Sequence, residues 1–134
     1  MTISHLNRTI GTIAESKGYR LYSHAEFFSP SMIASLPAAL LATPEFRSIE
    51  GRKSGKITYR LTLCLLAKGA RLAPAARTAL FEKLENDALA IMQRLSAAER
   101  VLAVEGLTIT PKTQPLSSLG DVAMEVEGDV VVEF

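Results

Sequence analysis

The residues of this chain that could do acid–base or nucleophilic chemistry are its two histidines and its one cysteine. A histidine that acts as a general base needs an orienting partner and a nucleophile close by. His24 has Glu26 and Tyr22 near it in the segment "YSHAEF", but such pairings are common outside active sites. His5 falls in the first turn of an expected helix. We therefore expect both histidines to be surface or interface residues.

Cys64 lies inside the segment "KITYRLTLCLLAK", which has the pattern of a strand. A buried thiol in such a place behaves as a small apolar side chain. A nucleophilic thiolate needs a cation or a helix N-terminus beside it, and Arg60 is two pleats away. One cysteine also excludes an intrachain disulfide and a cysteine-rich zinc site. We find no Walker phosphate loop, GxGxxG or HExxH motif, so we expect no enzyme, no cofactor and no metal.

Charged residues are more informative through their arrangement. Basic residues gather around the turn "EGRKSG" and the strand after it: Arg47, Arg52, Lys53, Lys56 and Arg60. Acidic residues alternate with apolar ones along the last segment: Asp121, Glu125, Glu127, Asp129 and Glu133. In one interpretation the two strands are neighbours, and Arg60 and Lys56 form cross-strand pairs with Glu125 or Glu127.

In the second interpretation the basic hairpin of one copy meets the acidic strand of the next, head to tail. Such a contact closes into a ring when the rotation between subunits allows it. The candidate subunit interface then consists of two sets of residues. They are Arg47, Arg52, Lys53 and Lys56 on one side, and Asp121, Glu125, Glu127, Asp129 and Glu133 on the other. Both interpretations remain open at this level.

Composition limits the class of protein. A chain of 134 residues with 48% hydrophobic and 22% charged residues is typical of one soluble domain, residues 1–134. The net charge of +1, the absence of Trp and the 6% aromatic content argue against a nucleic-acid partner. Apolar stretches are far shorter than the roughly 20 residues of a membrane span. The first residues lack the pattern of a signal peptide. We expect a cytoplasmic or virion protein with no membrane partner.

The first part, residues 1–35, is expected to be helical. Ser4 is a candidate N-cap, and Gly18 is a plausible stop. Apolar residues between them recur at helical spacing: Ile3, Leu6, Ile10 and Ile13. Ser29 and Pro30 predict the start of a short helix, which Leu36-Pro37 would end.

Residues 36–134 are expected to form a sheet covered by one long helix. The segment "AALLATPEFRSIE" predicts an irregular edge strand in a hairpin with the alternating strand that contains Cys64. Pro74 begins a helix with an apolar stripe: Leu80, Leu84, Ala88, Ile91 and Leu95. Ser96 and Glu99 have capping-box spacing, which predicts a second short helix through Val104. A short strand, "LTIT", would follow it.

The final segment alternates without interruption past Gly128. This favours one long strand with a bulge or bend at the glycine, and a hairpin turning at Glu127-Gly128 is the alternative. The sum is an α+β fold: an antiparallel β-sheet packed on one face by a long amphipathic helix, with an additional N-terminal helix. The expected buried sheet residues are Ile57, Tyr59, Leu61, Leu63, Leu65, Val122, Met124, Val126, Val130 and Val132.

This order of elements resembles the tail terminator (tail-completion, minor tail) proteins of long-tailed bacteriophages and prophages. The resemblance is carried by the N-terminal helix and by four segments: "LPAALLATPEFRSIEGRKSGKITYRLTLCLLAKGA", "AARTALFEKLENDALAIMQRL", "GLTITP" and "VVVEF". It covers residues 36 to 134, while "GYRLYSHAEFFSPSMIA" matches no part of the family pattern. The resemblance implies a small α+β structural protein that forms a ring on the end of the tail tube. Its partners would be further copies of itself and other tail proteins, and no catalytic residues would carry over.

Two other functions compete with this one. A small bacterial dimeric module without catalytic activity would bind a peptide or partner protein along an exposed sheet edge. A small enzyme would use Tyr22, His24 and Glu26 in a pocket between helix and sheet. The ring predicts salt-sensitive self-association, and the module predicts a monomer or dimer at all salt concentrations. The enzyme predicts a deep pocket with a perturbed titratable group.

Overall fold

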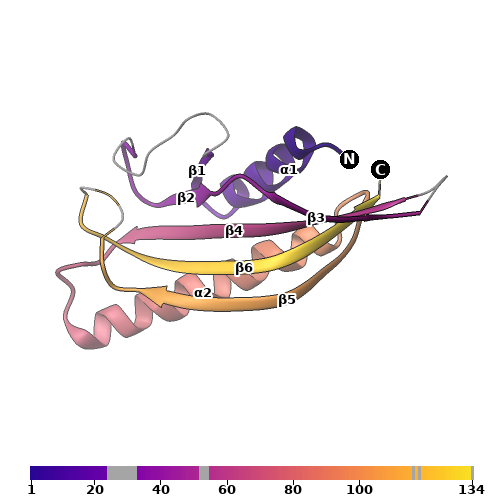
Figure 1. The fold of residues 1–134 in the computed structure, drawn as a ribbon. Coiled ribbons are helices and arrows are strands. Elements are labelled where there is room, and N and C mark those ends of the chain that lie inside the picture. The colour runs from indigo at the N-terminus through magenta and orange to yellow at the C-terminus, as the bar shows by residue number, and fades with distance from the viewer. Residues whose placement is uncertain (24–32, 52–54, 116, 118, 134) are drawn as a thin grey trace.

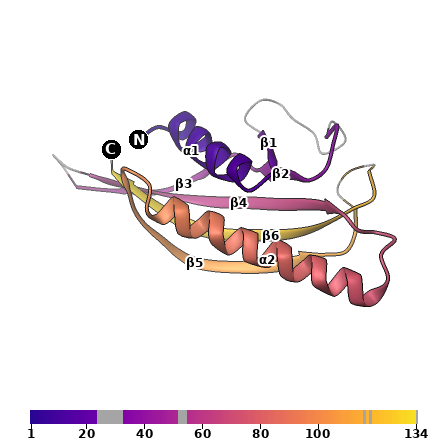
Figure 2. The same ribbon diagram turned by 180° about the vertical axis from the view of Figure 1, so that it is seen from behind.

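Six strands form one sheet in the computed structural model, which describes residues 1–23, 33–51, 55–115, 117 and 119–133 (Figure 1). Helices α1 (Ile3–Ser16) and α2 (Pro74–Ser96) pack on the same face of this sheet (Figures 1 and 2). The strands are β1 (Arg20–Ser23), β2 (Ala38–Leu41), β3 (Glu45–Glu50), β4 (Lys56–Lys68), β5 (Val101–Lys112) and β6 (Asp121–Glu133). The expected α+β fold with a long helix on the sheet is thereby confirmed. In the described part of the chain, neither helix is long and apolar enough to cross a membrane.

Strand order in the sheet is β1-β2-β4-β6-β5, and β3 pairs with the first residues of β4 as the expected hairpin. All pairs are antiparallel except β1 with β2, which are parallel. The sheet is therefore mixed, where we expected an antiparallel one. A parallel pair needs a long connection between its strands, and residues 24–37 separate β1 from β2 in the sequence.

Residues 1–35 are not purely helical, because Arg20–Ser23 is a strand. The short helix expected at Ser29-Pro30 lies outside the described residues. Helix α1 is capped by Thr2, whose side chain accepts a hydrogen bond from the His5 backbone N–H at 3.1 Å, and not by Ser4. A Cβ at Gly11 of this helix would lie 3.0 Å from Leu21 Cδ2 of β1, so a larger residue there would require Leu21 to shift slightly.

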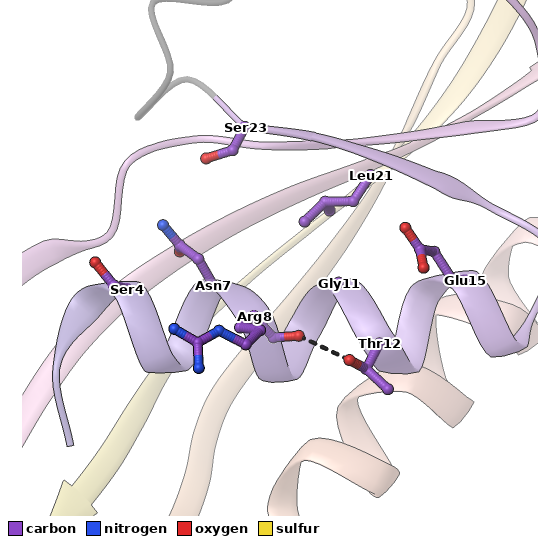
Figure 3. A pocket seen from close by; sticks show the side chains of 8 residues that line it. All are labelled: Ser4, Asn7, Arg8, Gly11, Thr12, Glu15, Leu21 and Ser23. Carbon is purple, nitrogen blue, oxygen red and sulfur yellow. Dashed lines mark hydrogen bonds between the residues drawn. The ribbon is translucent and has the colours of Figure 1, made fainter.

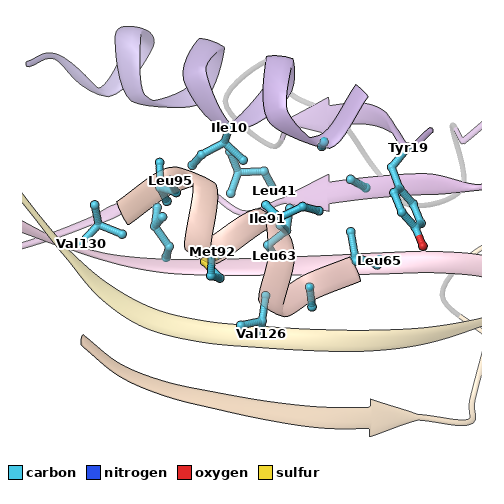
Figure 4. Packing of buried hydrophobic residues seen from close by; sticks show 14 of the residues in the cluster. Ile10, Tyr19, Leu41, Leu63, Leu65, Ile91, Met92, Leu95, Val126 and Val130 are labelled. Carbon is cyan, nitrogen blue, oxygen red and sulfur yellow. The ribbon is translucent and has the colours of Figure 1, made fainter. Parts of the chain in front are cut away.

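The main core lies between the helices and the sheet (Figure 4). Helix α2 buries most of the expected stripe, together with Met92: Leu84, Ala88, Ile91, Met92 and Leu95. All ten sheet residues expected to be buried belong to this core, Ile57 only partly. Each fully buried aliphatic side chain stabilises the fold by about 1.5–3 kcal/mol relative to an exposed one.

A second, smaller cluster lies on the opposite face of the sheet. Its buried members are Ile33, Ala38, Leu40, Cys64, Leu66 and Ala123. Because Leu63 and Leu65 point into the main core, the middle of β4 is buried on both faces.

Strand β5 begins at Val101, so the second helix that we expected through Val104 is wrong. The apolar residues after Glu99 pair with the end of β6, with Val101 opposite Val132 and Val104 opposite Val130. This long-range pairing outweighs the local capping signal at Ser96, and the helix ends at that residue.

Strand β6 is continuous from Asp121 to Glu133, which confirms the single-strand alternative. The irregularity lies on its partner. Glu105 pairs with Asp129 and Thr108 with Glu127, so β5 has one extra residue opposite Gly128. Gly106 takes a left-handed conformation at this bulge, with φ of 62°. Leu107 lies over Gly128, where a Cβ would be 2.6 Å from Leu107 Cδ2.

Candidate functional site

The polar face of the sheet carries most of the charged residues that we considered for an interface. Arg60 on β4 contacts two carboxylates of β6, Glu127 at 3.0 Å and Asp129 at 3.4 Å. The hydrogen bond to Glu127 is the main reason why the pKa of Arg60 is raised. These contacts are the intrachain cross-strand pairs of our first interpretation, although Asp129 takes part in place of Glu125.

Glu125 has a different partner within the chain. Its carboxylate lies 2.8 Å from the ammonium group of Lys112 on β5, and its side chain is only 17% exposed. A side-chain hydrogen bond with Glu125 and the guanidinium of Arg60 lower the pKa of Glu127. The middle acidic residues of β6 are thus matched by cations of β4 and β5, and they do not form an unpaired acidic surface.

Asp121 is fully buried, so it cannot contribute to a subunit interface as we expected. Its Oδ1 accepts hydrogen bonds from the backbone N–H of Ser117, at 2.8 Å, and from the Ser117 hydroxyl. The alternating pattern placed this residue on the acidic face of the strand. In the structure, its carboxylate binds the connection between β5 and β6, where the backbone N–H of Ser117 needs an acceptor.

Three of the remaining expected interface residues, Arg47, Lys56 and Glu133, lie at the hairpin end of the sheet. Arg47 is exposed on β3 and contacts Glu45 at 3.3 Å. Lys56 on β4 pairs in register with Glu133 on β6. Arg52 and Lys53 lie outside the described residues. Among the described residues, the structure therefore brings Lys56 and the end of the acidic strand together within one chain.

A polar cavity of about 510 Å³ lies between α1 and β1 (Figure 3). Its lining residues are Ser4, Asn7, Arg8, Gly11, Thr12, Glu15, Leu21 and Ser23. The Asn7 Oδ1 atom is buried and has no hydrogen-bond partner among the described residues, whereas the Thr12 hydroxyl donates to the Arg8 carbonyl at 3.1 Å. A hydroxyl, an amide and a guanidinium here can bind a small polar group.

The residues that suggested an enzyme are not assembled in the described structure. His24 and Glu26 lie outside the described residues, and the Tyr22 hydroxyl accepts a hydrogen bond from the Ala34 backbone N–H at 3.4 Å. Burial, followed by the charge of Glu125, raises the pKa of Cys64 to about 12. Its thiol is therefore protonated at neutral pH. Within residues 1–23, 33–51, 55–115, 117 and 119–133, no group of His, Cys, Asp and Glu is arranged to hold a metal ion.

Two apolar side chains at the β3–β4 hairpin are exposed, and we call them the hairpin pair. Phe46 is 58% exposed and Ile49 is 55% exposed. They lie opposite Tyr59 and Ile57 of β4, on the face that forms the main core further along the strand. The rings of Phe46 and Tyr59 meet edge to face, with centroids 6.4 Å apart. The apolar face of the sheet thus continues beyond the cover of the helices (Figures 1 and 2).

A groove of about 370 Å³ runs between α2 and β5, and we call it the α2–β5 groove. Its lining residues are Leu89, Met92, Gln93, Ser96, Val104 and Leu107. Leu89 is 44% exposed and Leu107 is 39% exposed, so both walls offer apolar surface to solvent. Leu107 can reach its position because Gly128 beneath it has no side chain.

Sequence patterns did not identify either apolar surface. Leu89 lies outside the stripe of α2, and Leu107 lies in a segment whose bulge could not be foreseen. Phe46 and Ile49 are three residues apart, but the register shift between Phe46 and Ser48 puts both on one face. The only sequence signal was the presence of large apolar residues among charged ones at a turn.

No family model matches the chain, and no curated protein matches it in sequence.

Proposed function

We propose that this chain is a structural tail protein of a bacteriophage or prophage, similar to a tail terminator. It acts by self-assembly and by protein–protein contacts at the end of the tail tube, and not by catalysis. The proposal is supported by the resemblance over residues 36 to 134, whose order of hairpin, long helix and terminal strand fits the described fold.

The observation that carries the proposal is the exposed hairpin pair. All six residues of β3 are exposed, yet two of them are Phe46 and Ile49, more than half exposed. The hairpin extends past the ends of both helices in Figures 1 and 2. Large apolar side chains gathered on one projecting element are a mark of a protein–protein contact.

The charge pairing within the chain changes what drives this contact. Arg60 and Lys112 already form ion pairs with Glu125, Glu127 and Asp129 in the middle of β6. Self-association then depends mainly on apolar surface, with a smaller contribution from charges at the rim. We therefore expect its dependence on salt to be weaker than a contact between a basic hairpin and an unpaired acidic strand would show.

Two measurements test the proposal. Light scattering over a range of protein concentrations, at low and high salt, should show species larger than a dimer that grow with concentration. Electron microscopy of gold-labelled protein, mixed with tail tubes of the phage or prophage that encodes it, should show label at one end of the tubes. Tubes without label at either end, together with a monomer at all concentrations, would refute the proposal.

The alternative function is a small bacterial dimeric module that binds a partner along a sheet edge, and β5 is such an edge. Its edge is interrupted, however, by register shifts between Val101 and Ala103 and between Glu105 and Thr108. Pro111 also removes one backbone donor. Natural edge strands carry such features to prevent strand addition. A stable dimer that binds extended peptides but not tail tubes would favour this alternative.

A further inference from the structure

We propose that a cavity at the end of the sheet opposite to the β3–β4 hairpin binds a carboxylate that carries a short apolar group. This cavity, which we call the basic cavity, has a volume of about 580 Å³. It lies where the connection from β4 to α2 meets the end of the connection from β5 to β6 (Figures 1 and 2). Its lining residues in the described part of the chain are Lys68, Gly69, Ala70, Arg71, Leu72, Leu119 and Gly120.

Two cations of the basic cavity have no counter-ion in the described part of the chain. Lys68 and Arg71 are exposed, and neither takes part in an ion pair there. Asp121 lies opposite Lys68 in the strand register, but it is fully buried and accepts hydrogen bonds from Ser117. Helix α2, which follows the connection, has no acidic residue before Glu82. The positive charge can therefore attract an anion from solution.

The other groups of the basic cavity determine which kind of anion fits. The backbone N–H groups of Gly69 and Ala70 bond to the Gly120 carbonyl, at 3.1 and 3.2 Å. The N–H of Leu72 bonds to the Gly69 carbonyl at 3.2 Å. These amides are therefore not available to a phosphate, whereas a guanidinium can bind a carboxylate through two parallel hydrogen bonds. Leu72, which is 39% exposed, and Leu119 offer apolar surface beside the cations.

Packing and hydrogen bonds hold the basic cavity in shape. A Cβ at Gly69 would lie 2.5 Å from Leu80 Cδ2 and 3.0 Å from Val122 Cγ2, so the chain at this glycine lies directly against the core. The guanidinium of Arg77 donates to the Ala70 carbonyl at 2.7 Å, which ties the connection to the first turn of α2. A ligand therefore meets a preformed site and does not have to order the connection.

NMR titration tests the site with hexanoate, a carboxylate on a short apolar chain. In ¹H–¹⁵N spectra at low salt, hexanoate should shift the amide signals of Ala70, Leu72 and Gly120 saturably, with a Kd of about 1–10 mM. Hexanamide has a similar shape without the charge, and it should produce much smaller shifts. Added sodium chloride should weaken the binding of hexanoate, because exposed cations are screened by salt.

A charge-removing variant and a matched control locate the binding. Lys68→Gln with Arg71→Gln changes two exposed side chains, so the fold should be kept, and the NMR spectrum itself checks this. Its affinity for hexanoate should fall at least about tenfold. Arg8→Gln with Arg100→Gln lowers the net charge equally, at two exposed residues outside the basic cavity. This control should bind hexanoate as the wild type does, and an equal loss in both variants would overturn the inference.

A second titration distinguishes two sources of the carboxylate, a free organic acid and an acidic segment of a partner protein. The probe is a short blocked peptide with one glutamate between two leucines. Binding at least about tenfold tighter than that of hexanoate assigns the site to a protein segment, and weaker or similar binding assigns it to a free acid. If neither probe shifts these amide signals saturably, or if hexanamide shifts them equally, the inference is wrong. The proposed self-assembly does not depend on this result, because the hairpin pair lies at the other end of the sheet.

Discussion

Gly128→Ala tests how the bulge of β5 is packed against β6. The added Cβ would lie 2.6 Å from Leu107 Cδ2 and 3.3 Å from the carbonyl oxygen of Glu105. The first distance is too short for a carbon–carbon contact, so Leu107 must leave its position. An off-rotamer side chain costs about 0.5–1.5 kcal/mol. Replacing glycine in an ordinary backbone conformation stabilises by about 0.4–1 kcal/mol through the unfolded state.

The two effects nearly cancel, so we expect Gly128→Ala to change the free energy of unfolding by at most about 1 kcal/mol, towards lower stability. In a Leu107→Ala background the clash is absent. There the same substitution should stabilise by up to about 1 kcal/mol, reduced by the close Glu105 carbonyl. The four proteins form a double-mutant cycle, with a coupling energy of about 0.5–1.5 kcal/mol.

Urea denaturation followed by circular dichroism measures all four free energies of unfolding, and equal m-values would show that the denatured states are comparable. If Gly128→Ala changes the free energy of unfolding by the same amount with and without Leu107, then Leu107 does not lie over Gly128. Leu107 would then not form a wall of the α2–β5 groove.

Three further predictions concern the core and its titratable groups. Ile91→Ala, at a fully buried position, should lower the free energy of unfolding by about 2–5 kcal/mol in urea denaturation. Leu72→Ala should change it by less than about 0.5 kcal/mol. A loss for Ile91→Ala as small as that for Leu72→Ala would place Ile91 outside the core. Tyr19→Phe removes the hydroxyl that donates to Asp87 Oδ2 at 2.5 Å, and should cost about 1 kcal/mol at pH 7. Burial raises the pKa of Asp87, but hydrogen bonds from Lys83 and Tyr19 lower it overall, so this stability is present above the unfolded pKa and is lost as pH falls through the folded one. The cost of Tyr19→Phe should therefore shrink in acid, and a cost that stays constant down to pH 2 would contradict the assignment. Because the pKa of Cys64 is raised to about 12, its reaction with a disulfide reagent at pH 8 should proceed only through opening of the fold and should accelerate with urea; rapid reaction of folded protein would show an accessible thiolate.

The periodicity of apolar residues was sufficient to predict the buried residues of each long element that is covered on one face. The stripe of α2 and the alternation of β4 and β6 predicted the main core, because each buried residue follows from the pattern of its own element. The alternation of charged and apolar residues also predicted that β4 and β6 carry opposite charges on the polar face of the sheet. It could not say whether Arg60 and Glu127 meet within one chain, since register is a property of the pair of strands.

The predictions that were wrong concern segments whose structure is determined by residues far away in the sequence. Val101 to Val104 form a strand because β6 lies beside them, although the local signal at Ser96 and Glu99 favoured a helix. Asp121 followed the acidic alternation, but the fold buries it to bind Ser117. Arg20–Ser23 is too short to show a pattern, and it is a strand because β2 pairs with it. The groove was hidden for the same reason, because Leu89 and Leu107 come together only through tertiary packing.

Burial along β4 is uneven, and this has a consequence for motion. Leu63 to Leu66 pair with β2 on one side and β6 on the other, and they are covered on both faces of the sheet. Their amide hydrogens can exchange with solvent only when most of the fold opens, whereas the fully exposed β3 can separate from β4 in a local fluctuation. The same strand therefore has a rigid end and an adaptable end. Strand β3 can therefore open while the centre of the sheet stays closed.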